Sequence, residues 1–176
     1  MDTEKHYRRY QEFQRYVQWS DYDVARVRSV AEMVEPYLQS LVEDFYEEIG
    51  HHPNASRVIT GGKEQVKRLK VTLVAWLQEL FSGQYDRDYL ERRWRIGKKH
   101  AEIGLDQVYT ITALSRLRAG LTSTLQQVWQ DDTSELMMTV CSLNKLIDLD
   151  IAIIEDAYQT AELQRVQASS QAMMHD

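Results

Sequence analysis

Apolar residues recur with the period of an α-helix along almost the whole chain, and this pattern constrains the fold more than any other feature of the sequence. Residues 37–49 show it most clearly, because Leu41, Phe45 and Ile49 share one face while acidic and amide side chains fill the other. The 176 residues contain only 2 prolines and 7 glycines, too few to supply the many turns of an all-β protein. We therefore expect an all-α protein with a single core.

The pattern divides into seven helical segments, the first of which has an aromatic edge that must dock on the rest of the chain. A loop is expected between the third and fourth segments, where Gly50, Pro53 and Gly61 interrupt the pattern. The polar residues 166–176, rich in Gln and Ser, predict a linker or a truncated connection to something longer. The expected helices span about residues 4–19, 20–35, 36–49, 63–81, 86–103 and 107–129, and the last runs from about residue 135 to beyond residue 163.

Composition and charge argue against several classes of protein. The net charge of −6 disfavours nucleic acid as a partner, because binding to phosphates depends on clustered positive charge. The single cysteine, Cys141, provides neither a disulfide framework nor a thiolate metal site. No uncharged run approaches the roughly 20 residues of a membrane span, and the N-terminus lacks the apolar core of a signal peptide. We expect a cytoplasmic protein without membrane contact.

No standard catalytic motif is present. The chain contains no G-x-S-x-G, no H-E-x-x-H, no Walker glycine loop and no dinucleotide fingerprint, so we do not expect an enzyme. The charged residues of the later helices have a simple explanation as solvated or interface faces. These are the basic run 92–99 and the acidic residues Asp148, Asp150, Glu155 and Asp156.

One histidine lies in the apolar stripe of the segment 86–105. On helical spacing Ile96, Gly97 and Ile103 share the face of His100, so the imidazole should point inward. Gly97 and Gly104 remove side-chain bulk around the ring, so a flat group could lie against the helix there. A lone inward histidine is more often packed core than a ligand, and both interpretations are open at this point.

A second inward polar group, Tyr46, lies on the apolar face of the segment 36–49. The segment 63–81 adds an apolar stripe that includes Leu73 and Trp76, with Thr72 at its margin. An apolar helical pocket with one histidine and one tyrosine fits haem, because the iron takes a neutral imidazole on its proximal side and the porphyrin needs apolar walls.

Three strings carry a resemblance to a known family: FYEEI around Tyr46, RLKVTLVAWLQELFSG at 68–83 and RRWRIGKKHAEIGL at 92–105. Together they resemble the sensor domain of globin-coupled sensors, in the family's order and at about its spacing. The resemblance implies a globin fold with an extra N-terminal helix and no well-formed D helix. It also implies one haem b per chain, a sensor domain over residues 1–165 and a connection to an output domain over residues 166–176.

The resemblance assigns roles to particular residues. His100 matches the proximal haem ligand and is the predicted metal-binding residue, Tyr46 matches the distal tyrosine, Leu69 a distal wall, and Thr72 a polar residue that helps to hold the ligand. The other residues that we predict to bind haem are Leu73, Trp76, Ile96, Gly97 and Ile103. After the histidine the family often has a proline and a Trp-Tyr pair, whereas this chain has Gln107, Tyr109 and Thr110, so the roles of Tyr109 and Thr110 stay open.

The function that the resemblance implies is a haem-based sensor of dioxygen, also open to carbon monoxide and nitric oxide, that passes a signal to a C-terminal output domain. Two alternatives stay open. One is a stand-alone protoglobin-like oxygen carrier or haem enzyme, and the other is a haem-free helical regulatory module in which His100 only packs in the core.

The last helical segment predicts a homodimer. Between Leu143 and Ile154 its apolar residues point in nearly every direction, and a helix that is apolar all round needs burial all round. We expect a partner subunit to cover one side, through an interface formed by the last two helices.

Overall fold

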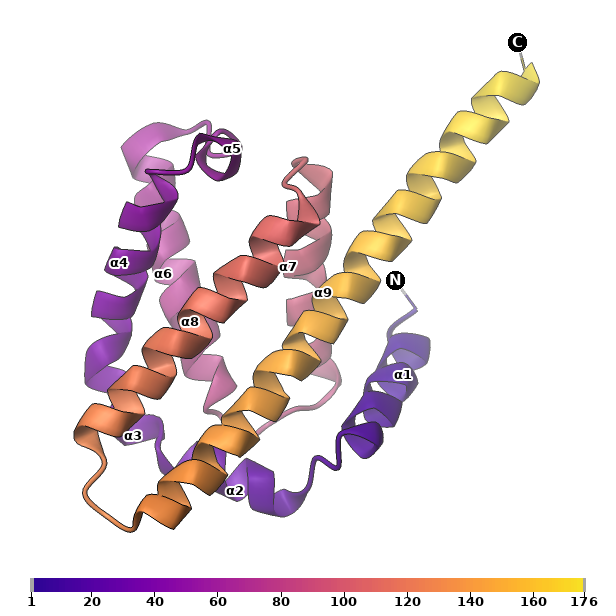
Figure 1. Ribbon diagram of the computed structural model, residues 1–176. Coiled ribbons are helices and arrows are strands. Elements are labelled where there is room, and N and C mark those ends of the chain that lie inside the picture. The colour runs from indigo at the N-terminus through magenta and orange to yellow at the C-terminus, as the bar shows by residue number, and fades with distance from the viewer. Residues whose placement is uncertain (1, 176) are drawn as a thin grey trace.

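The computed structural model describes residues 2–175, and these residues form helices joined by short loops, without a β-strand among them (Figure 1). The all-α prediction is confirmed. The helices are α1 (Thr3–Tyr16), α2 (Asp21–Ser29), α3 (Ala31–Val34), the 3-10 helix η1 (Glu35–Tyr37), α4 (Leu38–Ile49), α5 (Pro53–Ser56), α6 (Gly62–Leu80), α7 (Arg87–Glu102), α8 (Gln107–Val128) and α9 (Thr133–His175).

The helix boundaries follow local signals in the sequence. The Asp86 carboxylate accepts a hydrogen bond from the backbone N–H of Tyr89 at 3.1 Å, which caps α7 as expected. The segment 20–35, expected as one helix, divides at Val30 into α2 and α3. A single turn, α5, occupies the loop between α4 and α6, so no well-formed D helix is present among the described residues. Residues 166–175 continue α9 as an exposed helix.

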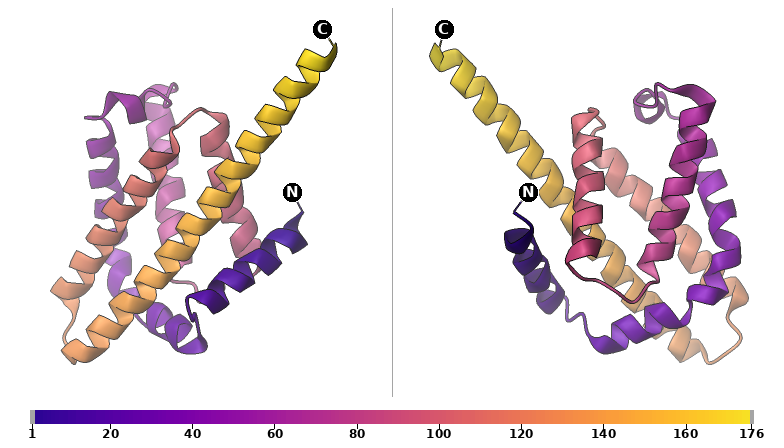
Figure 2. Two further views of the ribbon diagram at one scale, coloured as in Figure 1. Left: turned by 45° about the vertical axis from the view of Figure 1, so that its right-hand side comes forward. Right: turned by 180° about the vertical axis from the view of Figure 1, so that it is seen from behind.

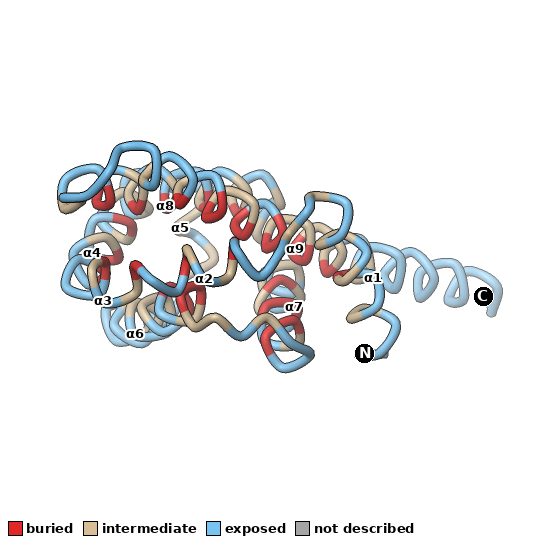
Figure 3. Tube along the Cα trace, turned by 90° about the horizontal axis from the view of Figure 1, so that it is seen from below, coloured by how far each residue is buried: buried red, intermediate tan, exposed pale blue. Residues whose placement is uncertain are grey.

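Helix α9 is the centre of the packing. It has 43 residues, and α2, α7 and α8 pack along its first two thirds, while its C-terminal part extends beyond the body of the protein (Figures 1 and 2). Figure 3 shows buried stretches on α7, α8 and α9, and an exposed C-terminal end of α9. The long helix therefore connects the core to a surface well outside it.

The structure corrects the reason for expecting a dimer. The apolar belt of α9 is already covered by the chain itself, since Leu146, Ile147 and Ile153 are only 0%, 1% and 2% exposed. Helices α1, α2, α7 and α8 of the same chain surround it. The belt needs no partner subunit to bury it, so it does not support the dimer, which stays a prediction.

Helix α1 docks on α7 and α9, which confirms the expectation for its aromatic edge. Tyr10 is buried in a cluster with Leu90 and Trp94 of α7 and with Leu149 and Ile153 of α9. The docking adds a small second core beside the main one.

Helices α6 and α7 run antiparallel, are joined by the loop 81–86, and diverge from that loop (Figure 2). His100 lies at the end of α7 away from the loop, and Leu69 lies in the half of α6 away from it. Among residues 2–175, none of the helices combines the length and the apolar character needed to cross a lipid bilayer.

Candidate cofactor site

His100 lies near the end of α7 with its ring half-buried. Its Nδ1 is 2.9 Å from the carbonyl oxygen of Ile96. A carbonyl can only accept, so Nδ1 carries the proton and Nε2 keeps its lone pair. Burial lowers the pKa of His100, against the opposite effect of this hydrogen bond, so the ring is neutral at pH 7. A neutral imidazole oriented through Nδ1 is a ready iron ligand through Nε2.

Tyr46 lies on α4, half-buried, with its ring edge-on to Phe45 at a centroid distance of 5.2 Å. Burial raises the pKa of Tyr46 to about 12, so the hydroxyl keeps its proton at neutral pH. Within residues 2–175 this hydroxyl has no hydrogen-bond partner. A protonated hydroxyl without a partner is a donor available to a ligand.

Four of the predicted residues belong to the main core or pack against it. Trp76 belongs to this core and is 8% exposed, and Tyr46, Leu73 and Ile96 pack against it from the α4, α6 and α7 sides. Leu69 is half-buried one turn before Leu73. The structure thus brings together apolar residues from three helices, with the half-buried His100 one turn beyond Ile96.

Two predicted residues lie outside this group. Thr72 is exposed, and its hydroxyl donates to the carbonyl of Arg68 at 3.1 Å, as threonines at the margin of a helix commonly do. Ile103 is 42% exposed and is the C-terminal cap residue of α7. Their predicted roles toward a cofactor gain no support from this arrangement.

Gly97 has a different role from the one expected. A Cβ atom at this position would lie 2.9 Å from the Cβ of Ala157 and 3.3 Å from the Cα of Ile154, both on α9. The expectation that Gly97 leaves room for a flat group was wrong, because α9 fills that side. The glycine instead lets α7 and α9 approach closely. Gly104 has φ of 80° and forms the turn after α7.

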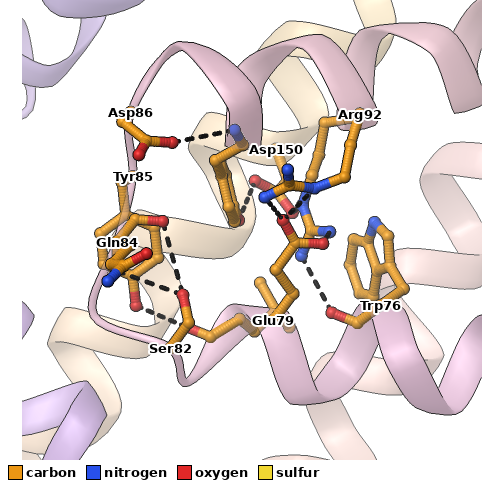
Figure 4. A network of polar contacts seen from close by, with 11 residues as sticks. Trp76, Glu79, Ser82, Gln84, Tyr85, Asp86, Arg92 and Asp150 are labelled. Carbon is orange, nitrogen blue, oxygen red and sulfur yellow. Dashed lines mark hydrogen bonds and ion pairs between the residues drawn. The ribbon is translucent and has the colours of Figure 1, made fainter.

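The sequence interpretation missed a buried polar network (Figure 4). Arg93 was expected on a solvated helix face and Asp150 on a solvated or interface face, yet they are 1% and 0% exposed. One signal pointed to Arg93: it precedes His100 by seven residues, which places the two side chains within about 20° on the helix circumference. Nothing comparable marked Asp150.

The residues present fit a haem. The site offers one neutral imidazole, apolar side chains from α4, α6 and α7, and a free hydroxyl donor. Nowhere in residues 2–175 do three or more His, Cys, Asp or Glu side chains gather to hold a bare metal ion. A porphyrin, which brings four of the iron ligands itself, needs only the histidine.

Comparison with known proteins decides the family. The sequence profile of the Protoglobin family matches residues 6–164. The chain belongs to the protoglobin family. The globin domain of the Geobacter sulfurreducens globin-coupled sensor shares the fold of this protoglobin domain, with a TM-score of 0.78, 24% identity, and coverage of 84% of this chain and 96% of the other.

A curated relative of this protoglobin domain is the protein named "Heme-based aerotactic transducer HemAT" of Halobacterium salinarum. The two are 27% identical over 154 residues, which are 83% of this chain and 32% of the relative. The chain therefore spans about a third of the length of that relative. These matches confirm the resemblance to sensor globins.

Proposed function

We propose that this protoglobin domain is a haem-based gas sensor that favours dioxygen. The observation that carries the proposal is His100, a neutral imidazole whose Nδ1–H is fixed by the Ile96 carbonyl and whose Nε2 is free. The name of the Halobacterium relative, a haem-based transducer, supports the same function. The haem would be of the b type, because the single cysteine cannot supply a C-x-x-C-H attachment.

When bound, a ferrous haem supplies a coordination position at which a diatomic gas binds. His100 would hold the iron through Nε2, and Leu73 and Ile96 would exclude water from the porphyrin. Tyr46 would donate a hydrogen bond to a ligand atom that carries negative charge. Dioxygen takes up negative charge on binding whereas carbon monoxide stays close to neutral, so Tyr46 favours dioxygen.

Two contacts offer a route from the histidine to α9. At Gly97 the two helices lie in close contact, because a Cβ added there would be 2.9 Å from the Cβ of Ala157 and 3.3 Å from the Cα of Ile154. Beyond the helix end, the N–H of Leu105 donates to the carbonyl of His100 at 3.1 Å, and the Tyr158 hydroxyl donates to the carbonyl of Leu105 at 2.9 Å. A displacement of the His100 turn would reach Tyr158 through a single residue, Leu105.

Tyr158 is well placed to pass a signal outward. Along α9 it is the last described residue whose side chain is hydrogen-bonded to another element, and the helix leaves the body of the protein just after it (Figure 2). We propose that the projecting part of α9 leads toward an output domain, in line with the greater length of the curated relative.

The first test is haem uptake. The purified chain, reconstituted with haem, should take up one equivalent and show a Soret band, and His100→Ala should lose stable uptake while keeping its helical content. His52→Ala, at an exposed position after α4, is the matched control and should bind as the wild type does. A chain that takes up no haem would instead favour the haem-free helical module.

The second test is ligand discrimination by Tyr46→Phe. A hydrogen bond to a charged acceptor in a dry site is worth about 1.5 to 3 kcal/mol, which corresponds to about 10- to 150-fold in affinity. The ratio of dioxygen to carbon monoxide affinity should fall by that order, measured from association and dissociation rates. Tyr37→Phe, at an exposed position just before α4, should leave the ratio unchanged. An unchanged ratio in Tyr46→Phe would contradict the distal role of the tyrosine.

A further inference from the structure

The Arg93 side chain joins three helices although it is 1% exposed. Its Nη1 is 2.9 Å from Glu79 Oε2, and its Nη2 donates to the carbonyl of Trp76 at 2.9 Å, both on α6. Its Nε is 3.3 Å from Asp150 Oδ2 on α9. One guanidinium on α7 therefore contacts the end of α6 on one side and the middle of α9 on the other.

Aromatic rings hold the guanidinium in place. The Cζ of Arg93 lies 4.6 Å from the ring centre of Trp76 and 4.2 Å from that of Tyr89. The Tyr89 hydroxyl donates to Asp150 Oδ1 at 2.8 Å, which fixes the carboxylate as well. A planar guanidinium with contacts at its faces and its edge has little freedom to rotate, so a shift of α7 must move its partners too.

The register of α6 and α7 relates this contact to the cofactor site. Trp76 follows Leu69 by two helical turns on α6, and Arg93 precedes His100 by two turns on α7. Since the two helices are antiparallel, the contact of Arg93 with Trp76 fixes how Leu69 and His100 are aligned along the helix axes. The contact lies between the loop 81–86 and the proposed haem.

Stability alone is a poor explanation for a buried ion pair. Removing two charges from water is unfavourable, and apolar replacements of such pairs often leave a protein equally or more stable. A buried pair can instead specify one arrangement of its helices. Glu79 on α6 also pairs with Arg92, so it would keep a cationic partner if Arg93 were replaced.

We propose that Arg93 is a positioning residue that couples the proximal helix α7 to α6 through Trp76 and Glu79, and to α9 through Asp150. The inference rests on the proposed function, because the displacement it transmits is that of α7 on ligand binding at the haem. It adds a third connection to α9, separate from those at Gly97 and Tyr158, and a connection back to the distal helix.

The test is hydrogen exchange, measured by mass spectrometry on the haem-loaded ferrous chain with and without carbon monoxide. In the wild type, the ligand should change the exchange of peptides covering residues 76–81, 146–154 and 158–164. In Asp150→Asn, which keeps the size and the acceptor for Tyr89, the change at 146–154 should fall, and what remains should come from the contact of Gly97 with Ile154. The changes at 76–81 and 158–164 should remain, because Arg93 still contacts α6 and Tyr158 is unaffected.

Asp148→Asn is the matched control, an exposed carboxylate on the same helix that pairs with Arg118. It should behave as the wild type. The proposal is overturned if Asp150→Asn keeps the full change at 146–154, or if the haem-loaded wild type binds carbon monoxide without any change at 76–81 and 146–154. A chain that binds no haem or no carbon monoxide refutes the proposed function instead.

The pair is also testable without haem or ligand. Arg93→Met should lower the folding equilibrium constant by at least about 100-fold, because it leaves the Asp150 carboxylate buried without a cation. Adding Asp150→Asn to Arg93→Met should restore most of the lost stability. Urea unfolding of the wild type, the two single variants and the double variant measures this coupling. Additive effects of the two substitutions would show that the side chains are not coupled and would overturn the proposal, whether or not the chain binds haem.

Discussion

Gly97→Ala tests how closely α7 and α9 must approach. The added Cβ would lie 2.9 Å from Ala157 Cβ and 3.3 Å from Ile154 Cα, whereas carbon atoms prefer about 3.5 to 4.0 Å. The Ile154 atom belongs to the backbone and cannot rotate away, so the helices must separate. Overpacking of this kind costs about 1 to 3 kcal/mol, and the better helix propensity of alanine returns up to about 1 kcal/mol. We expect a net loss of about 1 to 2 kcal/mol.

Thermal unfolding followed by far-ultraviolet circular dichroism measures the effect. For a chain of this size the loss corresponds to a fall of about 2 to 8 °C in Tm. Gly120→Ala on α8 is the matched control. Its added Cβ would lie 2.7 Å from the Cδ2 of Leu41, the far end of a flexible side chain that can turn aside. We expect Gly120→Ala to keep or raise Tm.

A double variant identifies the contact responsible. Gly97→Ala combined with Ala157→Gly should be more stable than the sum of the two single effects, by about 0.5 to 3 kcal/mol, because the closest contact is removed. The remaining 3.3 Å contact with Ile154 Cα keeps the rescue incomplete. If Gly97→Ala is as stable as the wild type, α9 can move away from α7 without loss of stability, and the close approach at Gly97 does not constrain α7.

Three further predictions follow from buried groups. Burial raises the pKa of Asp150 from its usual 3.8 to about 6, so the folded state binds a proton at higher pH than the unfolded state. As pH falls from 7 to 5 the wild type should gain about 1 kcal/mol relative to Asp150→Asn, and parallel urea curves at the two pH values would contradict this. Ile147→Asp should lose helical structure, since the side chain is 1% exposed, and a folded monomer in sedimentation would show the site to be an interface instead. Tyr158→Phe should cost about 0.5 to 1.5 kcal/mol and speed amide exchange at residues 103–106, and unchanged exchange would show that the hydrogen bond to Leu105 is not formed in solution.

The helices, and the apolar faces on which Tyr46 and His100 lie, could be predicted from the sequence, because both depend on local interactions. The period of the apolar residues places Tyr46 and His100 toward the interior, and the Asp86 cap and the turn at Gly104 mark the ends of α7. Such signals arise within a few residues along the chain, so they persist whatever packs against the helix.

What covers each face was decided only by the tertiary structure. Arg93 and Asp150 are charged residues whose residue type assigns them to a solvated or interface face, and they are buried because each supplies the other's partner from a distant part of the sequence. Gly97 allows α9 to pack closely, rather than leaving room for a cofactor, for the same reason: the helix that fills the space beside it lies far along the chain. The belt of α9 needed all-round cover, which the sequence showed, but the chain's own α1, α2, α7 and α8 provide it. Periodicity identifies a buried face, whereas the occupant of the space beside it depends on how distant helices cross.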